Sequence, residues 1–255
     1  MNQIAPSVTT TDYHFEDFTE KGYRSALVLA CAHWQFASFD TTTREPHVLW
    51  RHDIDVSPNR AARLAEIENG HAVKATYFFL LHSDFYNCME PATRDVMRRI
   101  VGLGHDIGLH FDVTFYPEID GVEALERRIA FESDVLGDLA AKTPLAVSFH
   151  NPTPEQLERY DQPRLAGLVN AYGKPLRTGY YYVSDSNGYW RFHRLHDVLA
   201  ERAAPALHVL THPEWWTPEC ASPRDRIVRA VEGRAASGLK AYDAFLAAQG
   251  RENVR

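Results

Sequence analysis

The sequence predicts an α/β protein whose parallel strands close into a distorted barrel within a single domain. Apolar, strand-like runs alternate with amphipathic stretches of helical period from Val48 to the end of the chain. Repeated strand–helix units imply parallel strands joined by right-handed crossovers. About six or seven such units fit this length, and they close more easily into a barrel than they form an open sheet.

The strands are expected where apolar and β-branched residues run together. The segment 74–81 (KATYFFLL) is almost wholly apolar, which is typical of a strand buried on both faces. The expected strands are Val48–Asp55, Lys74–Leu81, His105–Phe111, Ala146–His150, Tyr180–Ser184 and Leu207–Thr211.

Capping residues and apolar spacing predict the helices. Ser57-Pro58 supplies an N-cap and a first-turn proline, and Asn69-Gly70 supplies a stop signal. The segment 122–140 repeats apolar residues along one helical face. The other expected helices cover 21–36, 91–103, a turn after Thr153-Pro154, 195–203, and a long final helix from Ser222-Pro223 to about 248.

The chain shows no internal repeat and no linker that would divide it. Residues 1–20 are polar and rich in threonine, so we expect a loosely attached N-terminal arm followed by one domain over 21–255. No glycine-rich phosphate-binding loop follows any expected strand, which disfavours a nucleotide-binding fold.

Composition excludes several classes of partner. The net charge is −7 and no basic run occurs, so we expect no nucleic-acid partner and no anionic membrane partner. No apolar stretch is long enough to cross a membrane, and the N-terminal residues do not resemble a secretion signal. The three cysteines are widely spaced, without a CxxC pair. A cytoplasmic protein is the expectation.

Polar residues gather where the expected strands end, which is where barrel enzymes place their active sites. Asp53 and Asp55 lie on one face of their strand, and neighbouring carboxylates usually share a cation or a proton. A helix cap with a surface ion pair is the structural alternative, but two unpaired buried acids would be costly. The strand-end candidates are Asp53, Asp55, His110, His150, Asp185 and His212.

Other residues divide between structural and functional interpretations. His105 and Asp106 begin a strand, far from the proposed site, and are expected to be structural. Histidine titrates near neutrality, so His212, held at a strand end by Pro213, suits proton transfer to a leaving group. Core packing is the usual role of aromatic residues, but four of them could support a sugar ring. These are Phe111, Tyr182, Trp190 and Trp215.

Five short blocks, in order, resemble those of the polysaccharide deacetylase superfamily, also called NodB-homology or carbohydrate esterase family 4 proteins. The most specific block is Gly104-His105-Asp106-Ile107-Gly108-Leu109-His110. The other blocks are Asp53-Ile54-Asp55, His150-Asn151-Pro152, Asp185-Ser186-Asn187-Gly188-Tyr189-Trp190 and Leu207–His212. The resemblance implies a distorted (β/α)₇ barrel and a deacetylase that uses a divalent metal ion.

The resemblance also implies roles for individual residues. Asp53 would be the general base, Asp55 and His110 metal ligands, and His212 the general acid, with Asp185 holding a site residue in position. Two blocks depart from the family pattern. Thr114 stands where a second metal-binding histidine is expected, and His150 stands where an arginine is expected. We infer that His150 replaces the missing ligand, with Asp112 as the other candidate, and zinc is the expected ion.

The function implied by the resemblance is removal of an N-acetyl or O-acetyl group from a sugar or a sugar-containing precursor. The expected cytoplasmic location favours a precursor of surface polysaccharide. One alternative is a hydrolase of small non-sugar amides from the same superfamily, and another is an inactive carbohydrate-binding pseudoenzyme. A metal-free glycosidase that uses Asp53 and a second acid is a further alternative.

Overall fold

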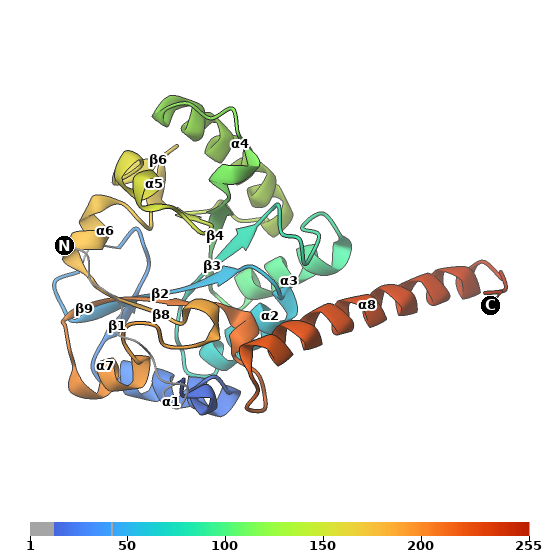
Figure 1. Cartoon of the computed structure of the whole chain (residues 1–255), viewed down its shortest axis with the longest axis horizontal. Helices are drawn as coiled ribbons and strands as arrows, with labels where there is room; N and C mark the ends of the chain where they lie inside the picture. Colours follow the sequence, from blue (N-terminus) through green and yellow to red (C-terminus); the bar gives the residue numbers. More distant parts are fainter. Residues whose placement is uncertain (1–12, 42, 255) are drawn as a thin grey trace.

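The computed structural model describes residues 13–41 and 43–254 of the chain. Figure 1 shows a curled sheet with helices packed around it and one long helix, α8 (Pro223–Ala248), that projects away from the rest. Among the described residues, no helix combines the length and the hydropathy needed to cross a membrane.

A nine-stranded sheet forms the centre of the molecule. Its order is β6-β7-β5-β4-β3-β2-β9-β8, with β1 beside β2. The seven strands from β7 to β8 run parallel, and only β6 is antiparallel to its neighbour. The strands are β1 (Gln35–Ala37), β2 (His47–Ile54), β3 (Thr76–Leu80), β4 (Asp106–Phe111), β5 (Ala146–Phe149), β6 (Arg164–Leu165), β7 (Leu168–Asn170), β8 (Tyr181–Ser184) and β9 (Ala206–Thr211).

The predicted α/β class with a mainly parallel, curled sheet is confirmed. The described strands leave the sheet open between its two ends, β6 and β8, so the barrel is curled rather than closed by hydrogen bonds. Strands β2, β3 and β4 are buried along their whole length. For β3, this burial was predicted from the apolar run at 74–81. These central strands end at the edge of the sheet that carries the candidate site.

The helices begin where the capping residues predicted. Ser57 accepts a hydrogen bond from the Arg60 backbone N–H, and Thr153 forms a reciprocal capping box with Gln156. The remaining helices are α1 (Glu20–Cys31), α2 (Pro58–Asn69), α3 (Pro91–Gly102), α4 (Val122–Ala140), α5 (Pro154–Arg159), α6 (Lys174–Gly179) and α7 (Leu195–Glu201), with four 3₁₀ turns, η1 (Phe15–Asp17), η2 (Val113–Phe115), η3 (Ser186–Gly188) and η4 (Pro213–Trp215).

Residues 13–20 differ from the expected loose arm. Phe18 is fully buried and packs on Trp190 and Trp216, and Asp17 accepts hydrogen bonds from Arg194. Burying an aromatic side chain and pairing a buried carboxylate fix this segment to the domain. Residues 1–12 of the predicted arm lie outside the described residues.

A buried polar network fixes β2 against β9, the strands that lead to Asp55 and His212. The two ring nitrogens of His52 lie 2.7 Å from Glu68 Oε1 and 2.6 Å from Thr211 Oγ1. Tyr77 donates a further hydrogen bond to Glu68. Because every member has a partner, the network is compatible with complete burial and ties α2 to both strands.

Candidate metal centre

Three predicted ligands converge at the carboxyl ends of neighbouring strands. Asp55 follows β2, His110 is the second-to-last residue of β4, and His150 follows β5. Nε2 of His110 lies 3.1 Å from Oδ1 of Asp55 and 3.2 Å from Nδ1 of His150. The same Asp55 oxygen lies 3.5 Å from Nδ1 of His150. One oxygen and two ring nitrogens therefore face a common point.

These separations fit a tetrahedral divalent ion. Ligand atoms at the usual zinc–nitrogen and zinc–oxygen distances lie about 3.3 Å from one another. Asp55 Oδ1 is buried and makes no well-directed hydrogen bond, although both histidine rings approach it. Burial alone would raise the pKa of Asp55, but the two rings hold it well below its ordinary value. A carboxylate oxygen and two imidazole nitrogens that converge in this way can hold zinc or a similar cation.

The structure separates the two candidates for the third ligand. Asp112 Oδ1 accepts hydrogen bonds from the backbone N–H of Thr114 at 2.8 Å and from its hydroxyl at 2.6 Å. Asp112 and Thr114 therefore satisfy each other in the turn after β4. His150 is the residue that lies with Asp55 and His110.

His212 and Asp185 form a hydrogen-bonded pair beside these ligands. Nδ1 of His212 lies 2.6 Å from Oδ1 of Asp185, and Nε2 lies 3.9 Å from Oδ2 of Asp55. The backbone N–H of His212 and the indole N–H of Trp216 both donate to Asp185 Oδ2. Burial would lower the pKa of His212, but the Asp185 carboxylate raises it to about 10. The imidazole is thereby held in place as a potential proton donor.

Asp53 lies beside the ring of His110, and both of its carboxylate oxygens accept hydrogen bonds. Its side chain is 1% exposed, and Arg51 donates a hydrogen bond to its Oδ2 at 3.1 Å. Ser148 donates to its Oδ1 at 3.4 Å, and Nδ1 of His110 lies 3.6 Å from Oδ2. Arg51 and Ser148 were not among the predicted site residues. Each stands two residues before a predicted site residue. Side chains two residues apart on a strand point to the same face, so this spacing is the sequence signal that could have identified them.

The four aromatic candidates separate into core and accessible residues. Phe111 is fully buried and stacks on Tyr116, and Trp190 is buried with its indole N–H donated to Asp17. These two side chains serve the core and offer almost no surface to a sugar ring. Trp215 is also buried, so its predicted contact with a sugar ring is not supported, whereas Tyr182 on β8 is 40% exposed.

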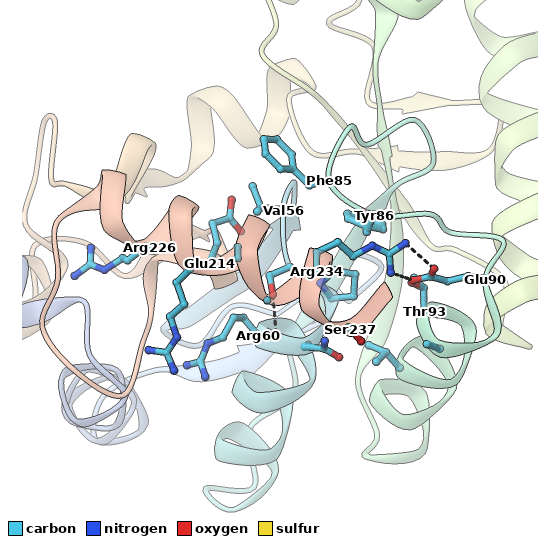
Figure 2. Close-up of a pocket in the computed structure, with 18 of the residues that line it drawn as sticks. Val56, Arg60, Phe85, Tyr86, Glu90, Thr93, Glu214, Arg226, Arg234 and Ser237 are labelled. Atoms are coloured by element: carbon cyan, nitrogen blue, oxygen red, sulfur yellow. Dashed lines mark hydrogen bonds and ion pairs between the residues drawn. The ribbon is translucent and has the colours of Figure 1, made fainter. Parts of the chain in front are cut away.

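Glu214 and a neighbouring cavity were not expected from the sequence. Glu214 in η4 is buried, and its Oε2 has no hydrogen-bond partner among the described residues. Burial and the nearby Asp55 raise its pKa well above the ordinary value. Glu214 lines a cavity of about 320 Å³ between the first turns of α2 and α3 and the start of α8. Figure 2 shows Arg234 of α8 paired with Glu90 at one side of this cavity.

Comparisons with known proteins give likenesses among solved structures alone. No protein-family model matches the chain, and no curated protein matches it. A family 4 acetyl xylan esterase from Clostridium thermocellum, solved with a cobalt ion, aligns over 73% of this chain and 84% of its own, with 18% identity and a TM-score of 0.44. The structure resembles carbohydrate esterases of family 4.

Two further solved structures are similar to the chain. The catalytic domain of a peptidoglycan N-acetylglucosamine deacetylase from Eubacterium rectale aligns over 79% of this chain and 90% of its own, with 14% identity and a TM-score of 0.48. A family 4 pseudoenzyme from Bacillus anthracis aligns over 77% of this chain and 63% of its own, with 12% identity and a TM-score of 0.43.

Proposed function

We propose that this protein is a metal-dependent hydrolase that removes an acetyl group from a nitrogen or an oxygen of a sugar. The observation that carries the proposal is the convergence of Asp55, His110 and His150 beside the His212–Asp185 pair. A cation site and an oriented proton donor, side by side at the strand ends, are the two parts that hydrolysis of an amide or ester requires.

Each residue has a role in the proposed reaction. Asp55, His110 and His150 would hold the ion, which supplies Lewis acidity toward the acyl oxygen and lowers the pKa of a water when bound. Asp53 is the proposed general base and takes the proton of the attacking water. His212 donates a proton to the departing sugar nitrogen or oxygen, and Asp185 keeps its ring in the required orientation.

The proposed ion is zinc, because one carboxylate and two imidazoles form a typical catalytic zinc set. The proposed substrate is a sugar nucleotide or a lipid-linked sugar used in the synthesis of surface polysaccharide. This choice rests on the cytoplasmic location expected from the composition. Tyr182 is the proposed aromatic contact for the sugar ring.

The ligand set is tested by replacing His150. His150→Ala should lose stoichiometric zinc and acetate release, because a carboxylate and one imidazole bind zinc weakly. His33→Ala is the matched control, since His33 is exposed in the turn that follows α1. Zinc per folded protein is measured by elemental analysis after reconstitution, with acetate release from N-acetylated sugars. Full zinc occupancy in His150→Ala would contradict the proposed ligand set.

The base is tested by Asp53→Asn. The variant should still take up zinc when zinc is supplied at saturation, because its three proposed ligands are intact, and it should lose turnover, because an amide cannot accept the proton. Undiminished turnover in a folded, zinc-loaded Asp53→Asn protein would exclude Asp53 as the base.

A carbohydrate-binding protein without catalysis is the second candidate function. The observation that favours it is the burial of Asp53, whose two oxygens are already engaged by Arg51 and Ser148. This candidate predicts that sugars bind to the zinc-loaded protein while no acetate is released. Acetate release by the wild-type protein, absent in His150→Ala, would eliminate it.

A further inference from the structure

The imidazole of His110 has different neighbours on its two nitrogens. Nε2 faces Asp55 and His150, whereas Nδ1 lies 2.7 Å from the hydroxyl oxygen of Ser148. Ser148 is fully buried in β5 and stands directly opposite His110 in the parallel register of β4 and β5. The sheet itself therefore brings this hydroxyl to the nitrogen that points away from the ligand cluster.

The contacts continue from Ser148 to a buried ion pair. Ser148 lies 3.4 Å from Oδ1 of Asp53, whose Oδ2 accepts a hydrogen bond from Arg51 at 3.1 Å. Arg51 is wholly buried and also donates to Tyr172. Both carboxylate oxygens of Asp53 therefore act as acceptors, Oδ1 toward the Ser148 hydroxyl and Oδ2 toward Arg51.

The direction of the next hydrogen bond follows from these two acceptors. Because Asp53 accepts, Ser148 must donate its single hydroxyl proton to Asp53. The Ser148 oxygen can then only accept from the ring, so Nδ1 of His110 carries the proton. Neutral imidazole has one N–H, and its Nε2 is therefore an unprotonated lone pair directed at Asp55 and His150. This is the tautomer that a metal ion requires.

We propose that Ser148 is a positioning residue of the metal centre, which fixes the Nδ1–H tautomer and the ring orientation of His110 through the buried Asp53–Arg51 pair. The inference rests on the proposed function in that Asp55, His110 and His150 are taken to hold a divalent ion. Outer partners of metal-bound histidines typically contribute about 10- to 100-fold to metal affinity.

His150 offers an internal comparison, because its ring lacks a buried anchor. Its Nε2 lies 3.0 Å from the side-chain amide of Asn151, which is exposed. An exposed amide can turn either its oxygen or its NH₂ to the ring, and water can replace it. We therefore expect Ser148→Ala to weaken zinc binding much more than Asn151→Ala.

The experiment measures zinc affinity by competition with a chelator in five proteins: wild type, Ser148→Ala, Ser148→Thr, Asn151→Ala and Ser133→Ala. Ser133, a buried serine on α4, is the matched control. Ser148→Ala should bind zinc about 10- to 100-fold more weakly, and Ser133→Ala should bind as the wild type does. Ser148→Thr, which keeps the hydroxyl, should restore most of the affinity. Equal zinc affinity in wild type and Ser148→Ala would overturn the proposal.

A second measurement, on the metal-free protein, separates this inference from the proposed function. The ¹⁵N shifts of the His110 ring should show a protonated Nδ1 in the wild type and a mixture of tautomers in Ser148→Ala. The same tautomer in both proteins would overturn the role of Ser148. If the wild type binds no divalent ion, the proposed function fails, while the tautomer measurement still decides whether Ser148 directs His110.

Discussion

At the residue scale, Asp185 holds His212 with both of its oxygens occupied. One oxygen faces the ring nitrogen at 2.6 Å, and the other accepts from the His212 backbone and from Trp216. Asp185→Asn should keep this shape but remove the charge that supports a protonated ring. We expect turnover to fall by about 10²- to 10⁴-fold with zinc content unchanged.

The measurement for Asp185→Asn is steady-state acetate release from the zinc-loaded protein, with Trp216→Phe as the control. Trp216→Phe removes one hydrogen bond to Asp185 and leaves its charge, so its effect should be smaller. Wild-type turnover in Asp185→Asn would show that His212 needs no carboxylate partner and would argue against its role as the acid.

The sequence predicted the strand-end residues of the site better than the residues behind them. Alternation along a strand placed Asp53 and Asp55 on one face, and strand ends located His110, His150 and His212. Arg51 and Ser148 were missed because a polar residue inside a strand carries no sign of its partner on another strand. Their pairing depends on the register of β2, β4 and β5, which a single sequence does not specify.

At the element scale, Asp106 ties the start of β4 to three other segments. Its carboxylate accepts hydrogen bonds from Ser38 at 2.6 Å and from Lys142 at 2.8 Å, and Lys74 lies 2.9 Å away. Burial would raise the pKa of Asp106, but Lys142 and the other donors lower it. A lowered pKa means that this stabilisation is complete above the unfolded pKa of about 4 and is lost as the pH falls through the folded value.

Asp106→Asn should therefore reduce stability at pH 7 by about 2 kcal/mol, the usual contribution of hydrogen bonds to a charged group. The difference from the wild type should shrink below about pH 4, where the wild-type carboxylate also becomes protonated. Denaturant unfolding at pH 7 and pH 3 measures both effects. A difference that is the same at the two pH values would contradict the assignment to the Asp106 charge.

Elements with caps or long apolar runs were predicted well, and short ones were missed. Helices α2, α4 and α8 begin at their predicted residues, because Ser-Pro caps and helical periodicity are local signals. Strands β6 and β7 have two and three residues, and they are defined by the pairing of β7 with β5 and of β6 with β7 rather than by their own composition. Helix 21–36 was predicted too long, since β1 begins at Gln35 to pair with β2.

At the scale of the whole molecule, α8 divides into an anchored half and a projecting half (Figure 1). Arg226 is buried against Phe18, and Arg234 forms a two-pronged ion pair with Glu90 of α3. Beyond Ser237 nearly every residue up to the end of α8 is exposed, including Leu239 at 68% and Phe245 at 55%. This outer half buries almost no apolar surface, so it contributes little to the stability of the domain.

A chain that ends at Ser237 should therefore keep its zinc content and its thermal midpoint to within about 2 °C. Hydrogen exchange on the full chain should show weak protection for amides in the outer half of α8, because a helical segment this short is marginal in water without packing. Amides of α2, which is held between the sheet and its neighbours, should exchange much more slowly. A midpoint lowered by more than about 5 °C, or strong protection beyond Ser237, would show that the outer half is stabilised by contacts that this single chain does not contain.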